Sequence, residues 1–201
     1  MCYTKEKRAC YVMYKRCITE QSARRQRELE QGLLNAMLSR GYDSVSISEL
    51  CDELGVPRKS FYRYFNGKEG ALYALIDHVL MDFSGEVFSE EAGAAMDTME
   101  RFFNYWKTNR RFVDAIVKND LISLFVWRAL SRSMEADVVA EKLLGLHAGM
   151  KREYVVSFFV SGLLSLLFQW HHANFRESPR EMASTALHLM TRPMFSVRLP
   201  K

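Results

Sequence analysis

Hydrophobic positions recur at helical spacing along almost the whole chain. Between residues 22 and 40, for example, Leu29, Leu33 and Met37 fall on one helix face, and Gly41 is a typical helix stop. No stretch alternates between apolar and polar residues for long enough to predict a half-buried strand. The pattern therefore predicts an all-α protein with helices over residues 22–40, 46–53, 57–64, 68–80, 90–108, 111–131, 134–148, 150–176 and 179–192.

Local signals define several of these helix ends. Residues 46–49 (Ser-Ile-Ser-Glu) and 178–181 (Ser-Pro-Arg-Glu) have the sequence of a capping box, in which serine and glutamate side chains bind the first free backbone N–H groups. Gly55 can adopt the left-handed conformation of a tight turn, and Pro57 suits the first turn of the next helix. Two short helices joined by such a turn predict a helix-turn-helix.

Charge is distributed unevenly along the sequence. The net charge is only +4, but residues 54–68 contain four cations and no acidic residue. Residues 1–27 contain eight lysines or arginines and two acidic residues. A helix that enters the major groove needs donors for base edges and phosphates on its exposed face. The second short helix, over residues 57–64, is therefore a candidate nucleic-acid-binding element.

Other classes of function find no support in the sequence. The four cysteines, at positions 2, 10, 17 and 51, lack zinc-site spacing and are typical of reduced thiols. The sequence contains no phosphate-binding loop, nucleophile elbow or HExxH motif, so we predict no enzyme activity, no cofactor and no metal site. Without the apolar run of a signal peptide near residue 1, the expected location is cytoplasmic.

One segment has two interpretations. Residues 154–170 are 17 residues without a charge, which is close to the length of a membrane-spanning helix. Their polar members recur every four residues and form one stripe along a helix; they are Ser157, Ser161, Ser165 and Gln169. Such a stripe favours a helix that packs on another helix of the protein or of a second copy.

The sequence over residues 40–69 closely resembles the DNA-binding signature of the TetR (tetracycline repressor) family; it is RGYDSVSISELCDELGVPRKSFYRYFNGKE. The resemblance extends over about residues 22–80, and in the C-terminal half only residues 105–112 and 177–183 look like a subgroup of the family. It implies a three-helix DNA-binding domain and a C-terminal helical bundle that binds an effector and dimerises. We expect a basic extension over residues 1–21, a DNA-binding domain over 22–80 and the bundle over 81–201.

The resemblance also implies a function and residues that carry it. The chain is expected to be a repressor that binds a palindromic operator as a homodimer and is gated by a small molecule. Its base contacts would come from Arg58, Lys59 and Ser60. Its phosphate contacts would come from Ser46, Tyr62, Arg63, Tyr64 and Lys68, while Phe61, Phe65, Leu50, Leu54 and Leu72 would form the core. Pro57 and Gly67 stand where the family usually has a capping side chain.

Dimerisation is expected from the apolar segment and the last helix. Two copies could cross along Ser157, Ser161 and Ser165, or along Phe159, Leu163 and Leu166. The final helix would add Ala183, Ala186, Leu187 and Met190. The alternative is that one chain buries all of these side chains in its own core.

Three further alternatives stay open. Side chains at helical spacing could line a pocket for a mainly apolar effector or could be core; they are Met99, Phe102, Phe103, Trp106, Phe125 and Trp127. Residues 1–21 could be an arm that enters the minor groove or a solvated tail. The chain could also be a co-regulator that keeps the fold without binding DNA, although the cationic helix over residues 57–64 argues against that function.

Overall fold

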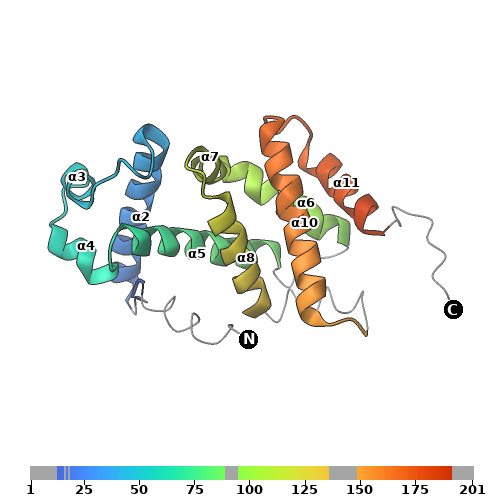
Figure 1. Ribbon diagram of the computed structural model, residues 1–201, viewed down its shortest axis with the longest axis horizontal. Helices are drawn as coiled ribbons and strands as arrows, with labels where there is room; N and C mark the ends of the chain where they lie inside the picture. The colour runs from blue at the N-terminus through green and yellow to red at the C-terminus, as the bar shows by residue number, and fades with distance from the viewer. Residues whose placement is uncertain (1–12, 16, 18, 89–94, 136–148, 192–201) are drawn as a thin grey trace. The chain divides into compact units, whose positions relative to one another are not determined.

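A computed structural model describes residues 13–15, 17, 19–88, 95–135 and 149–191, and over these residues the protein is helical without a β-strand (Figure 1). The all-α prediction is confirmed. The helices are α2 (Glu20–Arg40), α3 (Ile47–Glu53), α4 (Arg58–Tyr64), α5 (Lys68–Val87), α6 (Ala95–Thr108), α7 (Arg110–Lys118), α8 (Ile122–Glu135), α10 (Arg152–His172) and α11 (Pro179–Thr191).

Three predicted helices differ from the structure, and one of them, expected over residues 150–176, is α10, which ends at His172. The helix expected over residues 111–131 is two helices, α7 and α8, because Asp120 adopts a left-handed conformation with φ of 59°. The Asp120 N–H donates to Val117 and the Leu121 N–H donates to Ile116, which is the hydrogen-bond pattern of a Schellman helix end. Helix α5 continues to Val87, beyond the expected end at residue 80. Most of the helix expected over residues 134–148 lies outside the described residues.

The chain divides into two compact units. The first comprises Met1–Leu80 and Asp114–Phe125, and the second comprises Met81–Val113 and Val126–Lys201. The chain therefore passes from one unit to the other within α5, α7 and α8. The end of α7, the turn after it and the start of α8 belong with the helix-turn-helix, although residues 114–125 lie in the part of the sequence assigned above to the bundle.

The core of the first unit consists of apolar side chains from α2, α3, α4 and α5. Fully buried members are Leu29, Leu33, Met37, Leu50, Phe61, Phe65, Leu72 and Leu75. Leu54 was expected in this core, and that prediction is wrong, because its side chain is 37% exposed. Leu54 instead covers Gly32 of α2, where an added Cβ would lie 2.5 Å from Leu54 Cδ1.

The core of the second unit is mainly aromatic. Helices α6 and α11 pack against each other, and α11 buries Met182, Ala183 and Ala186. The N-terminus of α11 has the predicted capping box, since Ser178 Oγ accepts from the Glu181 N–H (3.3 Å) and Glu181 accepts from the Ser178 N–H (2.7 Å).

Candidate nucleic-acid interface

The helix-turn-helix begins at the predicted capping box of α3. Ser46 Oγ accepts from the Glu49 N–H at 3.2 Å, and Glu49 Oε2 accepts from the Ser46 N–H at 3.4 Å and the Ser46 hydroxyl at 2.8 Å. These hydrogen bonds favour the ionised carboxylate and lower the pKa of Glu49. Ser46 is exposed, so its position is compatible with the predicted phosphate contact at the start of α3.

The turn between α3 and α4 depends on a positive backbone angle. Gly55 has φ of 63°, and the Val56 N–H donates back to the carbonyl of Cys51 at 2.9 Å. Pro57, with φ of −62°, is the N-cap residue of α4 rather than its first helical residue, and its side chain has no group that could cap the helix. Helix α4 therefore begins after this turn without a side-chain cap at its N-terminus.

Helix α4 has one buried and one exposed face. Phe61 is fully buried, and its ring contacts Phe65 at a centroid distance of 5.0 Å. The structure brings four predicted DNA contacts together on the exposed face, while Ser60 is half-buried at its edge; the exposed four are Arg58, Lys59, Tyr62 and Arg63. This exposed face, defined here as the cationic face, carries three permanent positive charges and one phenol.

Tyr64 does not belong to the cationic face. It was expected to be exposed and to contact phosphate, but its side chain is only 7% exposed. The physical reason is its position three residues after Phe61, which places both rings on the same side of the helix. Tyr64 is therefore a core residue and is not retained as a phosphate contact.

Lys68 is held at the start of α5 by contacts with the loop after α2. Its ammonium group donates to the carbonyls of Tyr42 (2.9 Å) and Asp43 (3.3 Å) and lies 4.4 Å from the centre of the Tyr42 ring. An ammonium group has three N–H donors, so one stays available for a phosphate. Lys68 thus fixes the Tyr42 loop in addition to any role on DNA.

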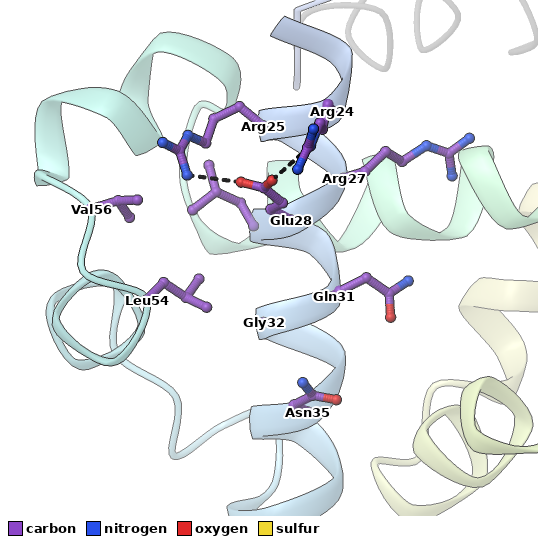
Figure 2. A pocket seen from close by; sticks show the side chains of 10 residues that line it. Arg24, Arg25, Arg27, Glu28, Gln31, Gly32, Asn35, Leu54 and Val56 are labelled. Atoms are coloured by element: carbon purple, nitrogen blue, oxygen red, sulfur yellow. Dashed lines mark hydrogen bonds and ion pairs between the residues drawn. The ribbon is translucent and has the colours of Figure 1, made fainter. Parts of the chain in front are cut away.

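Cations of the first helix lie near the helix-turn-helix and were not among the predicted site residues. Arg24 and Arg25 of α2 pair with Glu28 at 3.3 and 2.8 Å. Together with Arg27 they border a hollow of about 510 Å³, whose other side is formed by Leu54 and Val56 (Figure 2). The high density of arginines at residues 24–27 was the only sequence signal for this cluster.

The basic extension is partly folded. Of the two alternatives for residues 1–21, a solvated tail is wrong for residues 13–15, because their backbone pairs with the segment that follows α4. Lys15 is exposed there, next to the end of α4. The other lysines and arginines of residues 1–21 lie outside the described residues.

The expected dimer residues fall into two groups. Phe159, Ala183 and Ala186 are buried in the single chain, so they cannot form a seam with a second copy and that part of the prediction is wrong. The other six are half-buried, and their role stays a prediction: Ser157, Ser161, Leu163, Leu166, Leu187 and Met190.

The exposed face of α10 has a different set of side chains. Tyr154 and Phe158 are 71% and 73% exposed, and Gly162, Ser165 and Gln169 continue the same face along the helix. We call this set the α10 face. It was only partly anticipated by the serine stripe.

Most of the side chains expected around an effector are tightly packed. Phe102, Phe103 and Trp106 are buried, and Phe102 and Trp106 also contact Phe83 at centroid distances of 5.5 and 5.3 Å. Phe125 is buried as well and belongs to the first unit. These contacts place the rings in a core, which was the alternative left open by the sequence. Met99 is half-buried and Trp127 is exposed.

Family models match both halves of the chain. Residues 34–75 match the bacterial regulatory proteins of the tetR family, and residues 94–192 match a transcriptional regulator C-terminal region of the TetR type. No curated protein matches the sequence.

Solved structures share the fold at low sequence identity. A TetR-family transcriptional regulator from Syntrophomonas wolfei superposes with a TM-score of 0.68 at 15% identity, covering 89% of this chain and 100% of its own. The fatty acid degradation regulator FadR from Bacillus halodurans has a TM-score of 0.61 at 13% identity, covering 89% and 98%. A TetR regulator from Streptococcus agalactiae has a TM-score of 0.61 at 16% identity, covering 86% and 96%.

The fold, the helix-turn-helix with its cationic face and the two matched family models agree. The chain belongs to the TetR family, and it is a DNA-binding transcriptional regulator, not an enzyme.

Proposed function

We propose that the protein is a repressor that binds a palindromic operator as a homodimer and is released by a small-molecule effector. The observation that carries this proposal is the cationic face of α4. Arg58 and Lys59 lie in the first turn of that helix, are exposed, and have no acidic residue within residues 54–68 to neutralise them. A helix in the major groove presents its N-terminal residues to the base edges, where arginine or lysine can bind guanine O6 and N7.

The direct test is to select bound fragments from the source genome with the purified protein. A two-fold symmetric sequence with half-sites separated by about one helical turn, or 34–36 Å, is the expected result. Recovery of no fragment above background would contradict DNA binding and would favour the co-regulator alternative.

Alanine variants are expected to distinguish residues that contact bases from residues that contact phosphates. Arg58→Ala and Lys59→Ala should each weaken the best operator by about 1–3 kcal/mol and relax base preference at the position that they contact. Arg63→Ala should weaken all DNA sequences about equally and lower the dependence of log affinity on log salt by about one. Binding titrations on the operator and on single-base variants at several salt concentrations measure both effects. Uniform weakening by Arg58→Ala together with changed base preference in Arg63→Ala would reverse the assignment.

Dimerisation is supported by the α10 face. By length and composition α10 could also cross a membrane, and only 39% of its most apolar stretch is buried within the chain. A helix with large exposed apolar side chains needs a second surface, and a second copy supplies one while also providing the second half-site. We therefore assign the α10 face to a dimer in the cytoplasm.

Effector gating is supported by the turn that follows α7. Helix α7 begins at Arg110 in the second unit and ends at Lys118 in the first. Lys118, the last residue of α7, donates to the Leu38 carbonyl. Directly after the helix, the Asn119 amide accepts from the Tyr42 N–H and donates to the Met37 carbonyl at 3.3 Å.

One further hydrogen bond connects these residues to Lys68, a predicted phosphate contact. The carbonyl of Tyr42 accepts from Lys68 Nζ at 2.9 Å, so the turn after α7, the loop after α2 and the start of α5 are connected by hydrogen bonds. We propose that an effector bound by the second unit shifts α7 and thereby moves the Tyr42 loop and Lys68. A shift of the binding equilibrium by tenfold needs a difference of only about 1.4 kcal/mol between the two states.

Asn119→Ala is expected to loosen this connection. Each lost hydrogen bond removes about 1 kcal/mol, and the Tyr42 N–H loses its acceptor. Amide hydrogen exchange should accelerate at residues 37–43, and operator affinity should fall about tenfold without a change in base preference. Asn104→Ala, at an exposed position of α6, is the matched control. Unchanged exchange at residues 37–43 would exclude Asn119 as the connecting residue.

A further inference from the structure

The N-terminal segment packs directly against the end of the recognition helix α4. The Lys15 N–H donates to the carbonyl of Tyr64, the last residue of α4, at 2.8 Å. The Asn66 N–H, in the turn after α4, donates to the carbonyl of Met13 at 3.0 Å. Two backbone hydrogen bonds therefore attach the extension to the residues that connect α4 with α5.

The side chain of Tyr14 anchors this segment in the interior of the first unit. Tyr14 forms an antiparallel bridge with Phe65, and its hydroxyl donates to Asp77 Oδ2 at 2.7 Å. Asp77 lies on α5 and is buried. The ring of Tyr14 also meets the ring of His78 edge to face at a centroid distance of 5.9 Å. Tyr14 thus connects the extension with α5 as well as with the turn after α4.

A glycine of α5 makes room for this contact. A Cβ added at Gly70 would lie 2.1 Å from the carbonyl oxygen of Met13, which is closer than any two such atoms can approach. Glycine within a helix costs about 1 kcal/mol relative to alanine, so its presence at this position needs a reason. The approach of the Met13 backbone is that reason. At Gly85 of the same helix, no described atom lies within 4 Å of an added Cβ.

The recognition helix depends on such external contacts. It has only seven residues, and isolated helices of that length are unstable in water. Pro57 leaves its N-terminus without a side-chain cap, so its position is fixed by Phe61, by the turns at its ends and by the hydrogen bond from Lys15 to its last carbonyl. That carbonyl is one of the four that a helix cannot satisfy by itself.

Lys15 has the orientation expected of a DNA contact. In an extended segment successive side chains point to opposite sides, so the half-buried Tyr14, which bonds to the buried Asp77, directs Lys15 away from the core. Lys15 is exposed, and its backbone is bonded to the residue next to Arg63 of the cationic face. Its charge therefore lies beside the end of the helix proposed to enter the major groove.

We propose that residues 13–15 form a strap that belongs to the DNA-binding surface. The strap holds the end of α4 in place, and Lys15 adds a phosphate contact beside the cationic face. This inference rests on the proposed DNA binding, which it extends to a segment before the helix-turn-helix.

The test compares Gly70→Ala with Gly85→Ala in the full chain. Gly70→Ala displaces the strap, so we expect about a tenfold loss of affinity for the selected operator with α-helical content retained. Gly85→Ala changes the same residue type in the same helix and should bind operator like the wild type. Tyr14→Phe, which removes the hydrogen bond to Asp77 and keeps the ring, should lose about threefold and serves if Gly70→Ala does not fold.

Lys15→Ala tests the phosphate contact separately. It should lower the slope of log affinity against log salt by about one and leave base preference and melting temperature unchanged. An unchanged slope would overturn the phosphate contact, and operator binding by Gly70→Ala and Tyr14→Phe equal to that of the wild type would overturn the strap. A wild-type protein that binds no genomic fragment would instead overturn the proposed function together with this inference.

Discussion

Phe158→Arg is expected to convert the dimer to monomers and to lower operator affinity by at least about a hundredfold. Phe158 is 73% exposed in the single chain and belongs to the α10 face. Within one chain, arginine at this site loses an edge-to-face contact with the ring of Phe159, whereas in a dimer it would bury an unpaired charge at a cost of several kcal/mol. A monomer contacts a single half-site and loses the second set of contacts.

Sedimentation at micromolar concentration and operator titration measure the two parts of this prediction. Asn104→Arg, which adds the same charge at an exposed position of α6, should leave both unchanged. Circular dichroism should show the helical content of the wild type in both variants. A Phe158→Arg protein that still sediments as a dimer would exclude the α10 face as the interface.

The helix-turn-helix could be predicted from the sequence because its signals are local. The capping box at residues 46–49 and the left-handed Gly55 each act within one turn of helix. The burial of Phe61 and Phe65 follows from their spacing of four residues. No contact with a distant part of the chain is needed for any of these features.

Other features depend on contacts that the local sequence does not encode. The break between α7 and α8 has Asp120, not glycine, in the left-handed conformation, so the usual signal for a helix end is missing. The strap pairs Tyr14 with Phe65, which is 51 positions later in the chain, and no periodicity marks such a pairing. Leu54 is exposed because it covers Gly32 from outside the core.

Some residues buried within the single chain were predicted as dimer residues for a related reason. Helix α10 is apolar on nearly every side, so the periodicity of its sequence does not indicate which side faces its own chain. Ala183 and Ala186 are small and could suit close helix packing in either setting, and the structure buries them within one chain. Sequence reasoning thus pointed to α10 and α11, but it did not predict which faces of these helices the single chain leaves exposed.

A buried hydrogen-bonded pair of side chains, Glu30 and His78, holds α2 to α5. Glu30 of α2 is only 1% exposed, and both of its carboxylate oxygens lie 2.9 Å from His78 Nδ1 of α5. Because α5 also carries Gly70 and Lys68, the pair fixes the helix on which the strap and the Tyr42 loop are held. A carboxylate with so little access to water depends on its hydrogen bonds for stability in the folded protein.

His78→Ala is therefore expected to lower the free energy of unfolding of the first unit by about 2 kcal/mol, because it removes a hydrogen-bond partner from a buried carboxylate. This loss lies in the lower part of the range of about 1.5–3 kcal/mol for hydrogen bonds to charged groups, because the His78 side chain is 18% exposed. Urea unfolding followed by circular dichroism measures the loss, and His172→Ala, at an exposed histidine of α10, is the matched control with an expected change within about 0.5 kcal/mol. Replacing both partners, as Glu30→Leu with His78→Leu, removes the charge and should restore much of the stability that the single variant loses. If His78→Ala unfolded at the same urea concentration as His172→Ala, the Glu30–His78 pair would contribute nothing to holding α2 against α5. The double replacement would then be expected to destabilise the protein rather than rescue it.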